Sequence, residues 1–127
     1  MTANELFNKA ATALNSAQLL FQSGDFDGAC NRAYYAMFDA ARAALLVADG
    51  DDGVLAIKTH SGLISTFSLR LVKSGKVSLE LGKSFNKVED LRLIADYKGD
   101  PVETEQAQWA VAQARSFVEA LRALSAI

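Results

Sequence analysis

The chain has 127 residues, half of them apolar, with 13 basic and 15 acidic side chains and a formal net charge of −2. This length and composition predict one domain, spanning residues 1–127, that buries a real hydrophobic core. The slight negative charge gives no general attraction to nucleic acid, and no apolar run reaches the roughly 20 residues of a membrane span.

The cysteine count and the start of the chain bear on the compartment. Cys30 is the single cysteine, so an internal disulfide is excluded. Residues 1–9 lack the basic stretch and apolar core of a signal peptide. We therefore expect a cytoplasmic protein with no membrane association. With one histidine and one cysteine, we expect no metal site, and nothing in the sequence calls for a cofactor.

The first two predicted helices form a hairpin. One covers about residues 3–23, because Thr2 and Glu5 have the spacing of a capping box and an apolar residue recurs every three or four positions after them. Gly24 ends this helix, and Asp25 can cap the next one at once. The second helix runs to about residue 48, and a polar loop follows at residues 49–53. So short a link between the two helices requires them to be antiparallel.

Three more helices follow in the second half of the chain. We expect them at about residues 61–73, 78–98 and 101–126, the second of them ending at Gly99. Asp100, Pro101 and Glu103 fit the N-cap, N1 and N3 positions of the last helix. The predicted fold is all-α, an antiparallel up-and-down four-helix bundle with one additional shorter helix.

The second helix carries polar residues in an otherwise apolar sequence. Arg32, Tyr35, Asp39 and Arg42 share one of its faces, while apolar side chains such as Tyr34 fill the rest. A helix this apolar is mostly buried, and buried Arg and Asp residues need partners or a task. Arg32 and Asp39 lie about 10.5 Å apart along the axis, so the closer pair Asp39–Arg42 is the expected ion pair within one chain.

Three segments carry a resemblance to a known family. NRAYYAMFDAARAALL (31–46), KTHSGLISTF (58–67) and LRLIADY (91–97) resemble, in order and spacing, the HEPN superfamily, and in particular its small prokaryotic members. This resemblance implies a helical bundle that forms homodimers through its second and third helices. It also implies a toxin-like, metal-independent endoribonuclease, often encoded beside a minimal nucleotidyltransferase that neutralises it.

The resemblance also points to particular residues. The active motif of the family is Arg, four to six residues, then His; Arg32 matches the Arg, but Asp39 stands where the His is expected. In some members the nucleotidyltransferase adds AMP to a tyrosine near this motif, which makes Tyr35 and Tyr97 acceptor candidates. Phosphate, RNA or nucleotide contacts are expected from Arg32, Tyr35, Arg42 and Arg92.

Each of these residues also has a structural interpretation. Cleavage of RNA needs a base, an acid and a cation, and His60, the only histidine, can replace the missing motif residue or simply stabilise its loop. Asp39 can serve in proton transfer or in an ion pair, within the chain or with Arg32 across a dimer axis. Arg92 has the spacing of a helix salt bridge with Asp96. Two hypotheses stay open: a ribonuclease with catalytic Arg32, Asp39 and His60, and a non-catalytic module that binds nucleotide or a partner protein.

Overall fold

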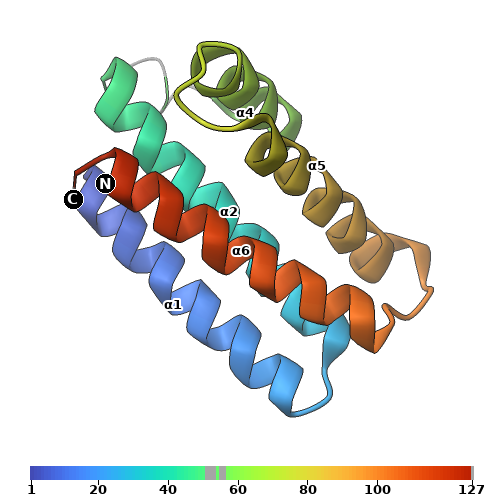
Figure 1. Cartoon of the computed structure of the whole chain (residues 1–127). Coiled ribbons are helices and arrows are strands. Elements are labelled where there is room, and N and C mark those ends of the chain that lie inside the picture. Colours follow the sequence, from blue (N-terminus) through green and yellow to red (C-terminus); the bar gives the residue numbers. More distant parts are fainter. Residues whose placement is uncertain (51–53, 55–56, 127) are drawn as a thin grey trace.

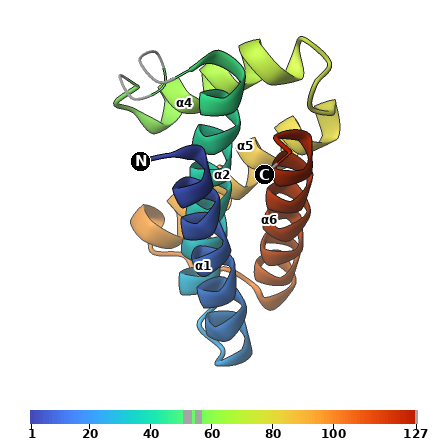
Figure 2. The ribbon, with the colours of Figure 1, turned by 90° about the vertical axis from the view of Figure 1, so that its left-hand side faces the viewer.

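The computed structural model describes residues 1–50, 54 and 57–126, and every regular element among them is helical. Four long helices run alternately up and down: α1 (Ala3–Gln22), α2 (Phe26–Asp49), α5 (Leu79–Leu93) and α6 (Thr104–Leu124) (Figure 1). The shorter α4 (His60–Phe67) lies across the end of the bundle where α1 begins and α6 ends (Figure 2). The predicted four-helix bundle with a shorter fifth helix is confirmed.

The hairpin of α1 and α2 forms as the sequence predicts. Thr2 Oγ1 accepts from the backbone N–H of Glu5 at 3.1 Å, and the Glu5 carboxylate accepts from the Thr2 N–H at 3.2 Å. Gly24 adopts φ = 88°, a left-handed conformation that favours glycine. Asp25 then caps α2 by accepting a hydrogen bond from the Gly28 N–H at 2.8 Å.

Two of the helices end in a wider, π-helical turn. α4 continues into η1 (Ser68–Val72), and α5 continues into η2 (Ile94–Lys98), which Gly99 closes with φ = 75° as the sequence predicts. Turns of this kind are frequent at functional sites. The predicted polar loop after α2 begins at Asp49 and Gly50, and its remaining residues, 51–53, lie outside the described part of the chain.

The predicted start of the last helix is wrong by three residues. The N-cap of α6 is Glu103, which forms a capping box with Gln106, whereas we expected the cap at Asp100. The physical reason is the segment before it: Val102 is buried, and its backbone N–H donates to Asp27 Oδ1 at 2.9 Å. Residues 100–102 therefore form a non-helical connection to α6, held in place by this hydrogen bond, and not the first turn of the helix.

The hydrophobic core surrounds α2, which packs against α1, α4, α5, α6 and η2. Its apolar face is buried as predicted, with Tyr34 and Met37 fully inaccessible. Phe67, Phe85 and Phe117 add a cluster of three rings, 5.0–5.6 Å between centroids, that joins α4, α5 and α6. This packing fixes the polar face of α2 beside the start of α4 and the end of α5.

Candidate functional site

Arg32 is held on α2 by neutral groups. Its Nε and Nη2 both donate to Asn31 Oδ1, at 3.0 and 2.8 Å, and its guanidinium lies 5.0 Å from the ring centroid of Tyr35. Asn31 in turn donates from Nδ2 to Asp96 Oδ2 at 3.0 Å, so η2 helps to orient it. Among the described residues, no carboxylate lies within 4.0 Å of the Arg32 guanidinium. The positive charge is therefore positioned but not neutralised.

The third nitrogen of this guanidinium faces solvent. Nη1 of Arg32 has no hydrogen-bond partner among the described residues, although Arg32 is half-buried. No buried side-chain nitrogen or oxygen in that part of the chain lacks a partner. It follows that Nη1 is reachable from outside, where it can donate to an anionic ligand.

Arg92 also lies near Tyr34 and Tyr35, but its charge is neutralised. It is 4% exposed, donates three hydrogen bonds of 2.9–3.2 Å to Glu89, and has Asp96 at 3.6 Å. Its guanidinium lies 4.8 Å from the centroid of Tyr34. Burial alone would lower the pKa of Arg92, but the hydrogen bonds and charge of Glu89 outweigh burial and raise it. The predicted pair with Asp96 is confirmed, and this geometry does not support the expected phosphate contact at Arg92.

His60 completes the cluster from α4. The N-cap of this helix is Thr59, whose hydroxyl accepts from the Gly62 N–H at 2.9 Å. The His60 ring lies among Phe38, Tyr34 and Tyr35, at centroid distances of 4.9, 5.5 and 5.8 Å. Its Nδ1 forms a 2.7 Å hydrogen bond with the Tyr34 hydroxyl. Tyr35 thus lies next to both Arg32 and His60.

Asp39 and Arg42 form a separate pair further along α2. Asp39 is 5% exposed, and its carboxylate lies 3.7 Å from the Arg42 guanidinium, as the spacing predicts. Burial raises the pKa of Asp39, while the positive charges of Lys9, Arg42 and Arg32 lower it in part. No direct ion pair between Arg32 and Asp39 forms among the described contacts, consistent with their separation along the helix.

Sequence reasoning missed several of the residues that organise this site. Tyr34 was expected only to pack in the core, where it is indeed fully buried, but its hydroxyl also reaches His60. Asn31 was not singled out, because its partner Asp96 comes from a distant segment. Glu89 was not singled out, because its pairing with Arg92 on one helix has no distinctive sequence signal. Tyr97, in contrast, is 73% exposed on η2, so its ring belongs to the surface.

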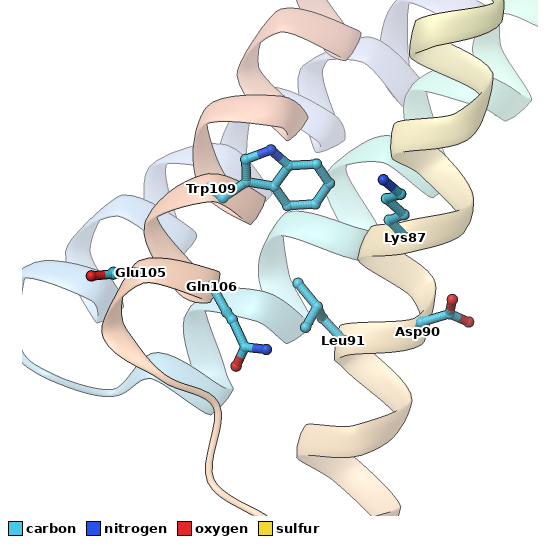
Figure 3. Close-up of a pocket in the computed structure, with 6 residues that line it drawn as sticks. All are labelled: Lys87, Asp90, Leu91, Glu105, Gln106 and Trp109. Carbon is cyan, nitrogen blue, oxygen red and sulfur yellow. The ribbon is translucent and has the colours of Figure 1, made fainter.

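One well-formed cavity lies away from this site. About 470 Å³ of space opens between α5 and α6, where the Trp109 indole points toward Leu91 and Lys87 (Figure 3). Leu91 lines the cavity, whereas the next residue, Arg92, pairs with Glu89 and lies against Tyr34 of α2. None of the residues lining the cavity is among the predicted site residues.

Among the described residues, no group of three or more His, Cys, Asp or Glu side chains is arranged to hold a metal ion. Of the helices they form, none is long and apolar enough to cross a membrane.

Comparison with known proteins identifies relatives along almost the whole chain. The profile of the HEPN domain matches residues 3–124. A "UPF0332 protein" of Thermotoga maritima is 37% identical over 119 residues, which cover 91% of this chain and 85% of that protein. The "UPF0332 protein glr0978" of Gloeobacter violaceus is 35% identical, covering 91% and 89%. "Putative toxin MJ0605" of Methanocaldococcus jannaschii is 33% identical, covering 92% and 84%.

Proposed function

Because the chain belongs to the HEPN domain family, we propose that it is a toxin-like protein that acts on RNA through the Arg32 face of α2. Support comes from a relative whose name describes a toxin and which shares 33% identity over most of both chains. The resemblance of the three sequence segments adds the reaction class, a metal-independent cleavage of the RNA backbone.

The observation that carries this proposal is the contrast among the three arginines of the site. Arg42 and Arg92 are paired with carboxylates, whereas Arg32 is oriented by a neutral amide and an aromatic ring and keeps a solvent-facing donor. A fixed, uncompensated guanidinium suits a phosphate oxygen, on which charge grows during cleavage. Arg32 would therefore bind the backbone and stabilise the pentacovalent transition state.

Two ionisable groups near Arg32 are candidates for proton transfer. His60 lies next to the same Tyr35 ring as Arg32. Asp39 shares the α2 face with Arg32, is close enough to feel its charge, and has a pKa raised by burial. A raised pKa brings a carboxyl group nearer to the range in which it exchanges protons at neutral pH.

A second candidate function is a non-catalytic module that binds nucleotide or a partner protein. One observation favours it: the position where the motif histidine is expected holds an almost fully buried aspartate that is paired with Arg42. In this case Arg32 would still bind phosphate, but no cleavage would follow.

Assembly and partners extend the proposal. A homodimer through α2 and α4 would place two copies of the Arg32 face next to each other, and a minimal nucleotidyltransferase would neutralise the toxin by adding AMP to a tyrosine. Tyr97, at 73% exposure, is the more accessible acceptor, whereas Tyr35 is half-buried against Arg32 and His60. Incubation with the transferase and ATP should add AMP to the wild type and not to Tyr97→Phe. A mass spectrum that shows no added AMP on the wild type would reject this extension.

The deciding experiment measures cleavage of a mixed RNA pool in EDTA by wild type and Arg32→Ala. Loss of one preorganised charge donor lowers kcat by about 100-fold or more, so Arg32→Ala should be close to inactive. Arg122→Ala is the matched control, because Arg122 also donates to an asparagine and lies over an aromatic ring, but on α6. Equal cleavage by all three proteins would refute the role of Arg32. RNA binding that depends on Arg32, without cleavage, would establish the second candidate.

A further inference from the structure

The two ring nitrogens of His60 have different surroundings. Nδ1 is engaged with the Tyr34 hydroxyl at 2.7 Å. Nε2 makes no hydrogen bond with any described residue, and His60 is only partly buried. The ring therefore has an inner nitrogen fixed by the protein and an outer nitrogen available to a ligand. The outer nitrogen belongs to the same cluster as the solvent-facing donor of Arg32.

The direction of the inner hydrogen bond follows from the surroundings of Tyr34. This side chain is fully buried, and burial together with the charge of Glu89 raises its pKa, so the hydroxyl keeps its proton. Nδ1 of His60 is the acceptor within hydrogen-bond distance of that proton. Glu89 lies nearby and accepts from Arg92, but the hydrogen bonds described for the Tyr34 hydroxyl do not include one to Glu89. If Nδ1–H were the donor instead, the buried hydroxyl proton would lose this acceptor, at a cost of roughly 1–3 kcal/mol.

We propose that Tyr34 is a positioning residue that holds neutral His60 with its proton on Nε2, so that His60 donates a hydrogen bond to an RNA phosphate beside Arg32. This inference rests on the proposed function for its ligand, the RNA backbone, but not for the state of the ring. The hydrogen bond made by one imidazole nitrogen decides which nitrogen carries the proton.

The assignment changes what His60 does in the proposed reaction. An Nε2 that already carries a proton cannot accept another from the 2′-hydroxyl of RNA. His60 then acts with Arg32 as a pair of phosphate donors that both lie next to the Tyr35 ring. Of the two candidate proton-transfer groups, Asp39 remains. The general-base role that the sequence suggests for His60 is replaced by phosphate binding.

The first test reads the ring directly. In 15N-histidine-labelled protein at a pH where His60 is neutral, the one-bond 15N–1H coupling should appear at Nε2, and the Tyr34 hydroxyl proton should show a contact with the ring that is lost in Tyr34→Phe. With a single histidine in the chain, the signals need no further assignment. A one-bond coupling at Nδ1 in the wild type overturns the proposal, whatever the protein does with RNA.

The second test separates a donor from a base. Binding of a fluorescent single-stranded RNA carrying 2′-O-methyl groups, which cannot be cleaved through the 2′-hydroxyl, should weaken about tenfold in His60→Ala. His60→Gln should stay within about threefold of wild type, because its amide nitrogen occupies nearly the place of Nε2 and donates. His60→Asn is the matched control, since its amide nitrogen corresponds to Nδ1, and it should bind as weakly as His60→Ala.

These arms distinguish the inference from the proposed function. If Arg32→Ala abolishes RNA binding but His60→Ala does not change it, the role of Tyr34 and His60 is refuted while the proposed function stands. If neither variant changes RNA binding, both are refuted. Rescue by Gln but not by Asn, together with the Nε2–H tautomer, supports the inference and cannot arise from a purely structural histidine.

Discussion

Removal of Arg92 should destabilise the fold far more than removal of a surface arginine. Arg92→Met keeps much of the length of the side chain and its apolar contact with Tyr34, but it leaves the Glu89 carboxylate without its partner. The Glu89 side chain is 14% exposed, so water only partly replaces the three hydrogen bonds that Arg92 provides. Asp96 suffers less, because it still accepts from Asn31 at 3.0 Å.

The expected loss follows from this arrangement. Breaking a buried ion pair by removing one partner costs about 3–5 kcal/mol. The lower end applies, since Asp96 is 26% exposed at its side chain and keeps a partner. A loss of about 3 kcal/mol in the free energy of unfolding corresponds to a fall in Tm of about 10 °C for a domain of this size.

Urea unfolding followed by circular dichroism measures this difference. Arg70→Met is the control, because the Arg70–Asp49 pair is exposed (58% and 33%) and an exposed pair contributes about 0.5 kcal/mol or less. In Arg92→Met/Glu89→Leu no carboxylate is orphaned at position 89, so this variant should recover most of the lost stability. If Arg92→Met loses less than about 1 kcal/mol with an unchanged m-value, or if the double variant falls further, the account of Arg92 as a buried ion-pair residue is refuted.

Three more predictions concern groups other than Arg92 and its partners Glu89 and Asp96. Burial raises the pKa of Asp39 in the folded protein above its pKa in the unfolded chain, so ionisation of Asp39 destabilises the fold as the pH rises through these two pKa values. The Tm of Asp39→Asn should therefore exceed that of wild type near neutral pH, and this difference should disappear in acid. Burial raises the pKa of the Cys30 thiol to about 12, so Ellman's reagent at pH 8 should react with Cys30 only after unfolding. Asp27→Ala should cost about 1–2 kcal/mol in urea unfolding, because the Val102 N–H loses its acceptor, while Asp27→Asn, which keeps an acceptor oxygen, should cost less; equal losses would contradict this.

The helical architecture could be predicted because its signals are local. Apolar residues at helical spacing and caps such as Thr2, Asp25 and Gly99 lie within a few positions of the helix ends they determine. The start of α6 could not be predicted in this way. Pro101 and Glu103 fit a local helix start, but the hydrogen bond between Val102 and Asp27 spans 75 residues and wins over that preference.

The candidate site was predictable in its residue types but not in its pairings. The spacing on α2 correctly predicted the Asp39–Arg42 pair, since both partners lie on one helix. The link from His60 to Tyr34 joins two helices 26 residues apart, and the link from Asn31 to Asp96 spans 65 residues. Such contacts depend on how the helices pack, which a helical periodicity does not encode. For this reason Tyr34, which the sequence places in the apolar core, also contributes its hydroxyl to the polar site.

The two arginines that lie over Tyr34 and Tyr35 differ in how their charges are matched. Tyr34 is buried under the guanidinium of Arg92, whose charge is matched by Glu89 and Asp96 and so belongs to the core. Tyr35 supports Arg32, whose charge no described carboxylate matches. A carboxylate beside Arg32 would neutralise its charge, as Glu89 does at Arg92. Asn31, the partner of Arg32, is neutral and leaves the Arg32 charge able to bind an anion. This is the strongest physical reason to look for phosphate next to Arg32.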